Sequence, residues 1–306
     1  MDDQERRRVG FILCIASAAS FGALPIFGKV AFDHDVNVVT FLFIRFSVAS
    51  AVLWLLVAAR RERVRGHARR LILGGILMGM LAYGIQSTMY FLALERIDAS
   101  LSALLLYAYP AMVTAAAILL GRERATGTLL AALGVATVGT ILLLGDGLTG
   151  DADSVGVVLG FAAAICYTAY ILAGDTLVAS LPPVLLAALV TAGGSLAFGG
   201  YGVASGSLRF DVDAAAWLSM GGAAIVGTVF AVGMLLPGIE RVGASTASVL
   251  STVEPATTVV LAVLLLDERA SSVQLMGGVL LLAAIVLCQR VRRPMVDLEP
   301  VPGVPA

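Results

Sequence analysis

The feature that most constrains the fold is a series of ten long apolar segments, separated by short polar stretches. They cover residues 9–31, 36–59, 71–94, 98–121, 127–145, 155–179, 183–205, 215–237, 243–266 and 273–290. About 20 mostly apolar residues are enough to cross a bilayer as a helix. Lipid admits only helices and closed barrels, and barrel strands alternate in polarity, which these segments do not. The sequence therefore predicts an all-α polytopic membrane protein with ten transmembrane helices.

The composition excludes several classes of protein. Hydrophobic residues make up 59% of the chain and charged residues 13%, whereas a soluble chain is nearer a quarter charged. The short loops leave no room for a soluble catalytic or nucleotide-binding domain, and a net charge of −1 gives no footprint for nucleic acid. The two histidines, His34 and His67, lie in separate loops with no metal-binding spacing, and no phosphate-binding loop motif occurs. We therefore expect no cofactor, no metal and no enzymatic activity.

The distribution of basic residues predicts the orientation in the membrane. Fifteen of the twenty basic residues fall on one side, at Arg6, Arg7, Arg8, Arg60, Arg61, Arg63, Arg65, Arg69, Arg70, Arg122, Arg124, Arg241, Arg290, Arg292 and Arg293. The positive-inside rule then predicts a multi-pass protein of the inner (plasma) membrane with both termini in the cytoplasm. We expect residues 1–8 to form a cytoplasmic N-terminal tail and the proline-rich residues 291–306 to form a disordered cytoplasmic C-terminal tail.

An internal repeat divides the chain into two halves. Residues 95–124 and 240–269, a shift of 145, are identical at twelve of thirty positions without a gap. Each repeat therefore holds five segments, at 9–145 and 155–290. Because five is odd, the two halves enter the membrane with opposite polarity. Inverted repeats with a binding site near the midplane are a recurrent design of transporters.

Four motifs stand out: the stretch from Ser20 to Lys29, the Arg45-Phe46 pair, the repeated A-S…P-A…E-R pattern of the fourth and ninth segments, and Glu254-Pro255. In these motifs the chain resembles a known family, the EamA-like transporters of the drug/metabolite transporter superfamily. It implies ten helices in two inverted halves around a cavity lined by the first, third, fourth, sixth, eighth and ninth helices. It also implies export of small solutes, often amino acids or their relatives.

Two prolines and two charges stand in the middle of predicted helices. Pro110 and Pro255 occupy equivalent places in the two halves and predict kinks that serve either as gating hinges or as static packing features. Glu254 precedes Pro255 near the bilayer centre, where an ionisable group is costly and indicates function: it could carry a proton, bind a substrate ammonium group or be a structural carboxyl. Arg45 lies at similar depth in the second segment; a structural role is favoured over pairing with Glu254 or a substrate carboxylate.

Polar side chains gather on the helices that the resemblance places around the cavity. Tyr83, Gln86 and Tyr90 recur at helical spacing and share one face. Further polar residues are Ser102, Tyr107, Tyr109, Tyr167, Thr168, Tyr170, Ser248, Ser251 and Thr252. From this set, the predicted substrate-binding or coupling residues are Glu254, Tyr83, Gln86, Tyr90, Tyr109, Tyr167 and Ser251. Interhelical packing is the alternative role for each of them.

These features together predict a secondary transporter that exports small organic metabolites by alternating access. Amino acids are the leading candidates for the substrate, and either protons through Glu254 or the solute gradient could drive the flux. An exporter of drugs or toxic organic cations is the alternative within transport, favoured if Glu254 is free of Arg45. A non-transporting scaffold or lipid-handling protein is the alternative of another class. The sequence leaves the oligomeric state open.

Overall fold

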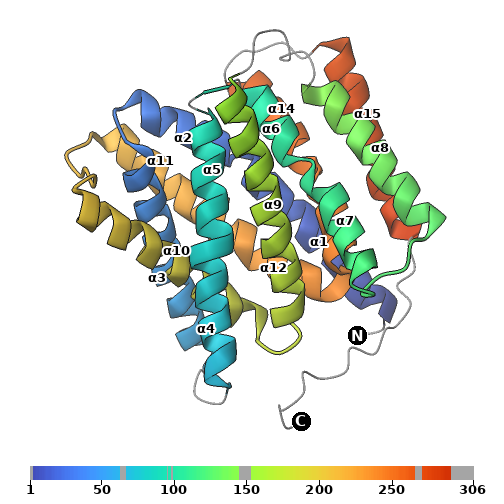
Figure 1. Cartoon of the computed structure of the whole chain (residues 1–306), viewed down its shortest axis with the longest axis horizontal. Helices are drawn as coiled ribbons and strands as arrows, with labels where there is room; N and C mark the ends of the chain where they lie inside the picture. The colour runs from blue at the N-terminus through green and yellow to red at the C-terminus, as the bar shows by residue number, and fades with distance from the viewer. Residues whose placement is uncertain are drawn as a thin grey trace.

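A computed structural model describes residues 3–62, 67–94, 96–97, 99–144, 153–265 and 271–290. Every regular element in these ranges is a helix (Figure 1), so the expected all-α class is confirmed. The proposed C-terminal tail, residues 291–306, lies outside the described residues.

Each apolar segment coincides with one helix or with consecutive helices. The first half contains α1 (Asp3–Gly22), α2 (Leu24–Asp33), α3 (Val38–Ala59), α4 (Arg69–Leu77), η1 (Met78–Tyr83), α5 (Gly84–Leu94), α6 (Ala99–Leu106), α7 (Tyr109–Leu119) and α8 (Gly127–Leu144). The second half contains α9 (Ser154–Leu177), α10 (Pro183–Ser205), α11 (Ala214–Ala224), η3 (Ile225–Phe230), α12 (Ala231–Val242), α13 (Ala244–Leu250), α14 (Val253–Leu265) and α15 (Ser272–Arg290). The two segments labelled η are π-helical.

The first apolar segment differs from the expected single helix in two ways. Its helix begins at Asp3, so the described residues of the expected N-terminal tail extend α1. It is also interrupted at Ala23, where α1 ends and α2 begins. Pro25 explains the interruption, because proline lacks the N–H that would continue the hydrogen bonds of α1 into α2 and is tolerated in the first turn of a helix.

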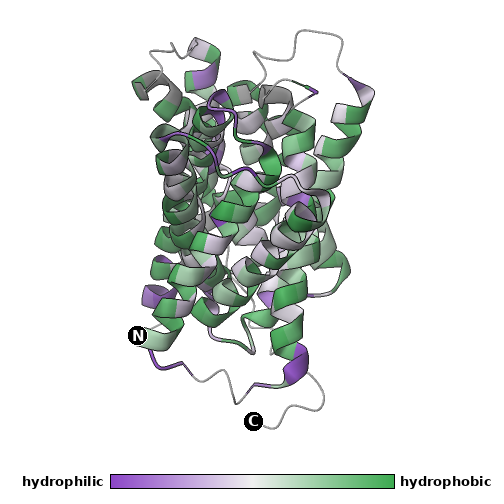
Figure 2. Ribbon diagram, turned by 90° about the vertical axis from the view of Figure 1, so that its left-hand side faces the viewer, coloured by the Kyte–Doolittle hydropathy of each residue, from purple (hydrophilic) through white to green (hydrophobic). Residues whose placement is uncertain are grey.

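The apolar helices mark a multi-pass membrane protein. Six helical stretches are long and apolar enough to cross a bilayer, at 4–33, 38–59, 69–94, 154–177, 183–205 and 214–242. Shorter apolar helices cover 104–119, 127–143 and 272–287. Hydrophobic residues follow the helices along their length, whereas hydrophilic residues gather toward the two ends of the bundle (Figure 2). This is the pattern of a bundle whose sides face lipid.

The helices pack in a pattern that is unchanged when the two halves are exchanged. The most extensive contacts join α8 to α15, α3 to α10, α1 to α12 and α5 to α9. The α8/α15 and α3/α10 pairs join corresponding helices of the two halves and lie toward opposite sides of the bundle (Figure 1). In the other two pairs, α1/α12 and α5/α9, the first apolar segment of one half contacts the third apolar segment of the other half. The interior between the outer pairs is therefore built from both halves.

Candidate functional site

The fourth and ninth apolar segments are each broken by a turn next to a proline. Residues 107–108 separate α6 from α7, and residues 251–252 separate α13 from α14. Pro110 and Pro255 lie in the first turn of the helix that follows each break. Because proline has no N–H to donate to the preceding turn, it disrupts a helix least when it stands at such a helix start. The internal repeat therefore produces two discontinuous helices at equivalent places.

The break in the first segment lies directly against the break in the ninth. A Cβ atom added to Gly22 would lie 2.6 Å from the backbone carbonyl oxygen of Glu254, so only glycine permits this approach. The hydroxyl of Thr258 donates to the carbonyl oxygen of Gly22 over 2.9 Å. Such a donor is required because a carbonyl at a helix end inside the membrane has no water to bond. Two helix breaks thus meet at Glu254.

Glu254 is enclosed by the protein but retains accessible surface. Its carboxyl group lies deep among protein atoms, and its residue surface is of intermediate exposure. Tyr90 and Tyr107 combine the same two properties. Accessible surface on a side chain that lies this deep among protein atoms indicates a space beside it. The hydroxyl of Tyr107 lies within hydrogen-bonding reach of the Glu254 carboxyl group. We infer a cavity bordered by these three side chains.

No cation neutralises this carboxyl group directly. Within the described residues, no Arg, Lys or His nitrogen forms an ion pair with Glu254 at 4.0 Å or less. Glu254 instead stands in the first turn of α14, where the helix dipole favours negative charge. A carboxyl group in this position can bind a cationic group or accept a proton from the cavity.

Aromatic rings form a continuous wall from Tyr107 to Tyr83. The ring of Tyr109 lies edge-on to Tyr167 with centroids 4.6 Å apart, and Tyr167 stacks on Tyr170 at 5.6 Å. Tyr170 in turn lies 4.8 Å from Tyr83, and Tyr107 lies 6.2 Å from Tyr109. Tyr83, Tyr90, Tyr107, Tyr109 and Tyr167 are all close enough to Glu254 for its charge to act on their hydroxyl groups. Ring faces beside a carboxylate suit an organic cation.

Arg45 lies close to this wall but not on the cavity. Its side chain is 1% exposed, and its guanidinium group donates to the hydroxyl groups of Thr228 and Tyr83, each over 2.7 Å. A longer bond of 3.4 Å reaches the carbonyl oxygen of Gly227. Arg45 acts on Glu254 only through longer-range electrostatics. The guanidinium group is therefore occupied by other partners rather than by Glu254.

Among the proposed binding residues, Gln86 and Ser251 use their polar groups in hydrogen bonds with residues on their own helix or at its end. Gln86 is buried, and its amide oxygen accepts a 3.4 Å bond from the neighbouring Ser87. Ser251 lies in the turn beside Glu254, but its hydroxyl donates to the carbonyl oxygen of Ala247 over 3.0 Å. Ser251 is also within hydrogen-bonding reach of the Tyr109 hydroxyl. Tyr83, Tyr90, Tyr109 and Tyr167 are the proposed residues gathered around Glu254.

Sequence reasoning missed three contributors to this region. Gly22 and Pro25 were treated as part of an uninterrupted helix, although the proline signalled the break. Thr228 was not considered, although it stands 145 residues after Tyr83, the shift of the internal repeat. Its role as an acceptor for Arg45 depends on a contact between helices that are distant in sequence.

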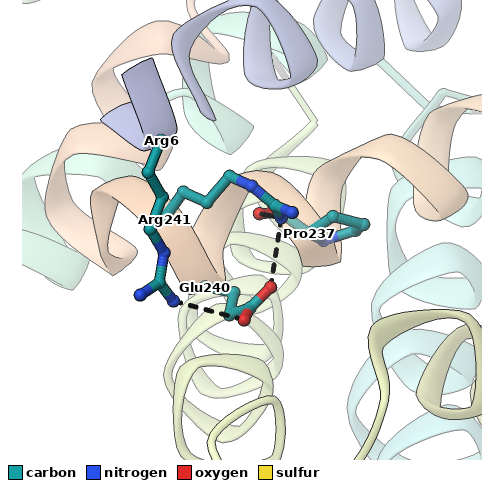
Figure 3. A network of polar contacts seen from close by, with 4 residues as sticks. All are labelled: Arg6, Pro237, Glu240 and Arg241. Carbon is teal, nitrogen blue, oxygen red and sulfur yellow. Dashed lines mark hydrogen bonds and ion pairs between the residues drawn. The ribbon is translucent and has the colours of Figure 1, made fainter. Parts of the chain in front are cut away.

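A separate polar network ties the start of α1 to the end of α12 (Figure 3). The carboxylate of Glu240 accepts from Arg6 over 3.3 Å and from Arg241 over 3.1 Å, and Arg241 also donates to the carbonyl oxygen of Pro237 over 2.7 Å. Side-chain exposures of 51% for Arg6 and 29% for Glu240 place this network at the surface, away from the cavity. The described residues contain no group of three or more His, Cys, Asp or Glu side chains that could hold a metal ion.

Comparison with known proteins identifies the family. The model of the EamA-like transporter family matches residues 8–145 and 154–289, one match in each half. The chain is 25% identical over 276 residues to a protein named "Uncharacterized transporter YcbK" from Bacillus subtilis (strain 168), covering 88% of each chain. A solved structure titled "Crystal structure of protein" shares the fold, with a TM-score of 0.78, 17% identity and coverage of 91% of this chain and 95% of that one. The chain is a multi-pass membrane transporter that belongs to the EamA-like transporter family.

Proposed function

We propose that the chain crosses the membrane ten times and exports small organic solutes by alternating access of two inverted five-helix halves. Ten apolar segments that each coincide with a helix or consecutive helices support this number. An odd number of crossings in each half would give the halves opposite polarity, and the symmetric helix contacts fit such an arrangement. The distribution of basic residues supports a plasma-membrane location with both termini in the cytoplasm.

The observation that carries the proposal is the enclosed but accessible carboxyl group of Glu254, which has no ion-pair partner within the described part of the chain. A solute that carries an ammonium group would supply the missing positive charge. The tyrosine faces around the carboxyl group would stabilise the same charge. Amino acids have such a group and are our first candidates, and proton exchange at Glu254 would couple their export to the proton gradient.

A second candidate substrate class is favoured by the contacts of Arg45. An amino acid also carries a carboxylate, and Glu254 would repel it unless a cation lay nearby. Arg45 acts on Glu254 from a distance and could be considered for this role. Its side chain is only 1% exposed, however, and its guanidinium group is bound to hydroxyl groups. This arrangement favours amines or other organic cations that lack a carboxylate.

Efflux from proteoliposomes tests both candidates. Phenylalanine and phenethylamine form a matched pair that differs only in the carboxylate, and each is measured with and without an imposed pH gradient. Loss of the charge in Glu254→Gln should slow efflux by about tenfold or more, since a charged hydrogen bond contributes about 1.5–3 kcal/mol. Glu240→Gln, a carboxyl group of the surface network, is the matched control and should retain efflux.

The outcomes separate the hypotheses. Acceleration by the gradient in wild type but not in Glu254→Gln would establish coupling through Glu254, whereas gradient-independent flux would indicate a facilitator. Faster efflux of phenethylamine would select organic cations over amino acids. If neither compound nor a wider panel of metabolites and cations crosses, and Glu254→Gln and Pro255→Ala leave the cellular phenotype unchanged, the scaffold or lipid-handling alternative replaces transport.

A further inference from the structure

The third helix of each half contains the same irregularity. A six-residue π-helical segment interrupts residues 69–94 at Met78–Tyr83 and residues 214–242 at Ile225–Phe230. A π-helical turn carries an extra residue and displaces the backbone hydrogen bonds, and such turns often occur at functional sites. Tyr83 in the first segment and Thr228 in the second are separated by 145 residues and are therefore equivalent in the internal repeat.

One guanidinium group binds both of these equivalent residues. Nε of Arg45 donates to Oγ1 of Thr228 over 2.7 Å, and Nη2 donates to the phenolic oxygen of Tyr83 over 2.7 Å. Nη2 also lies 3.4 Å from the carbonyl oxygen of Gly227, inside η3. Arg45 therefore joins the π-helical segment of its own half to that of the other half.

The clamp, defined as Arg45 with Tyr83 and Thr228, has no second copy. The position equivalent to Arg45 in the second half is Val190, which cannot donate from its side chain. The backbone of Val190 contacts η1 instead: a Cβ atom added to Gly79 would lie 2.7 Å from the Val190 carbonyl carbon. Corresponding positions of the second and seventh segments thus both contact η1, but only Arg45 reaches η3 as well.

Packing alone gives a poor account of Arg45. A buried charge without a carboxylate partner is expensive, and an apolar residue of similar volume is often equally or more stable in such a place. Within the described residues, the hydrogen-bond acceptors of Arg45 are all neutral oxygens, and the ring faces of Phe46 and Tyr83 lie 5.1 and 5.7 Å from the guanidinium group. A hydrogen bond to a neutral hydroxyl group can break without leaving an unpaired charge on the acceptor. The contacts of Arg45 therefore suit an interface that breaks and re-forms during a conformational change.

The clamp is also in contact with the wall of the cavity. The Tyr83 ring lies 4.8 Å from Tyr170, which stacks on Tyr167 at 5.6 Å. Because these rings are in contact, a displacement of Tyr83 would be transmitted to the rings beside Glu254.

We propose that Arg45 is a positioning residue that holds the third helices of the two halves together in this conformation. When the halves change position, the guanidinium group releases one hydroxyl partner and keeps the other. This inference rests on the proposed alternation of the two halves for its role in transport. It goes beyond the proposed function by assigning Arg45 a contact with both halves, outside the binding site.

Transport kinetics and thermal stability of the same variants test the clamp. Arg45→Met, Tyr83→Phe and Thr228→Val each remove a part of it, and Thr228→Ser restores the hydroxyl. We expect Arg45→Met, Tyr83→Phe and Thr228→Val each to change turnover by about tenfold or more, because one charged hydrogen bond shifts an equilibrium by that factor. The KM should stay within about twofold of the wild-type value. Arg45→Met should lower turnover without a matching fall in melting temperature, because its cost to the fold is limited to the lost hydrogen bonds of neutral acceptors. Arg45→Lys should not rescue turnover, since one ammonium group cannot replace the guanidinium fork.

Ser47→Ala is the matched control. Ser47 lies on the same helix as Arg45 and forms a 2.7 Å hydrogen bond with Ser195 of the other half, but it contacts neither π-helical segment through that bond. The Ser47→Ala variant should therefore have the turnover of the wild type. If Arg45→Met loses stability and turnover in parallel, or if Ser47→Ala reduces turnover as much as Thr228→Val, the clamp is refuted and Arg45 is a structural residue.

A second measurement does not depend on knowing the substrate. A single cysteine at Ala108, a half-exposed residue beside Tyr107, is introduced after the three native cysteines are replaced. Its alkylation by a small hydrophilic reagent is measured from each side of the membrane. The clamp predicts that Tyr83→Phe and Thr228→Val shift the ratio of the two rates by about tenfold and that Ser47→Ala does not. An unchanged ratio refutes the clamp even if transport is established, whereas a shifted ratio without any flux refutes the proposed function and leaves the clamp standing.

Discussion

Replacing Gly79 by alanine should destabilise the contact between η1 and α10. The added methyl group would overlap the carbonyl oxygen of Val190 and would lie 2.7 Å from its carbonyl carbon and 2.9 Å from its Cα atom. Carbon atoms at optimal contact are about 3.5–4.0 Å apart, so the two helices would have to separate by about 1 Å at this point. The obstacle is backbone, which cannot rotate out of the way as a side chain could.

The size of the effect follows from this separation. A radial gap of about 0.5–1 Å removes roughly a quarter to a half of the dispersion energy of each contact across it. Overpacking in an ordered core costs about 1–3 kcal/mol, and alanine recovers only about 1 kcal/mol over glycine in a helix. We therefore expect a net loss of about 1–2 kcal/mol in the free energy of unfolding.

The assay is unfolding of the purified protein in detergent, followed by helix content, with Gly221→Ala as the matched control. Gly221 also lies in the third helix of a half, in α11, but an added Cβ there would have no neighbour within 4 Å. Gly221→Ala should therefore stabilise the protein slightly. If Gly79→Ala is as stable as Gly221→Ala, the close approach of η1 to α10 is wrong. Gly193→Ala, whose methyl group would lie 3.0 Å from the Ile76 carbonyl carbon, should add little to the loss caused by Gly79→Ala, because both substitutions separate the same helices.

Two further predictions concern the loops. Hydrogen bonds from the backbone N–H of Ala216 and from the His34 ring hold the pKa of Asp213 below its ordinary value, so the carboxylate stabilises the fold above about pH 4 and this contribution is lost as the pH falls through the lowered pKa. In acid-unfolding curves, Asp213→Asn should therefore be less sensitive to pH than wild type or the exposed control Asp211→Asn, and equal slopes would contradict this. A cysteine at Arg61 should resist an impermeant thiol reagent in intact cells, whereas one at Asp211 should react; the opposite pattern would reverse the proposed orientation.

The limits of sequence reasoning are clearest at the helix breaks. Pro110 and Pro255 fell within the predicted fourth and ninth helices, and in the structure each lies just after a turn, because proline removes a backbone donor wherever it stands. Pro25 obeys the same rule, but its segment was expected to continue. The π-helical segments carry no comparable local signal, since they are mainly apolar like the helices that flank them and contain no proline. They are recognised only from the backbone hydrogen bonds of the folded chain.

The sequence by itself determined the all-helical membrane class and the two-fold division of the chain. Both follow from local properties, because the length of an apolar run and the identity of residues 145 positions apart can be counted along the chain. Only the tertiary structure decided the partners of the two buried charges. Arg45 and Glu254 are 209 positions apart and could have formed an ion pair, but Arg45 binds Thr228 and Tyr83, and Glu254 has no ion-pair partner among the described residues. Hydrogen-bond geometry depends on how α3, η1, η3 and α14 are placed in space, and a linear pattern of residues does not contain that information.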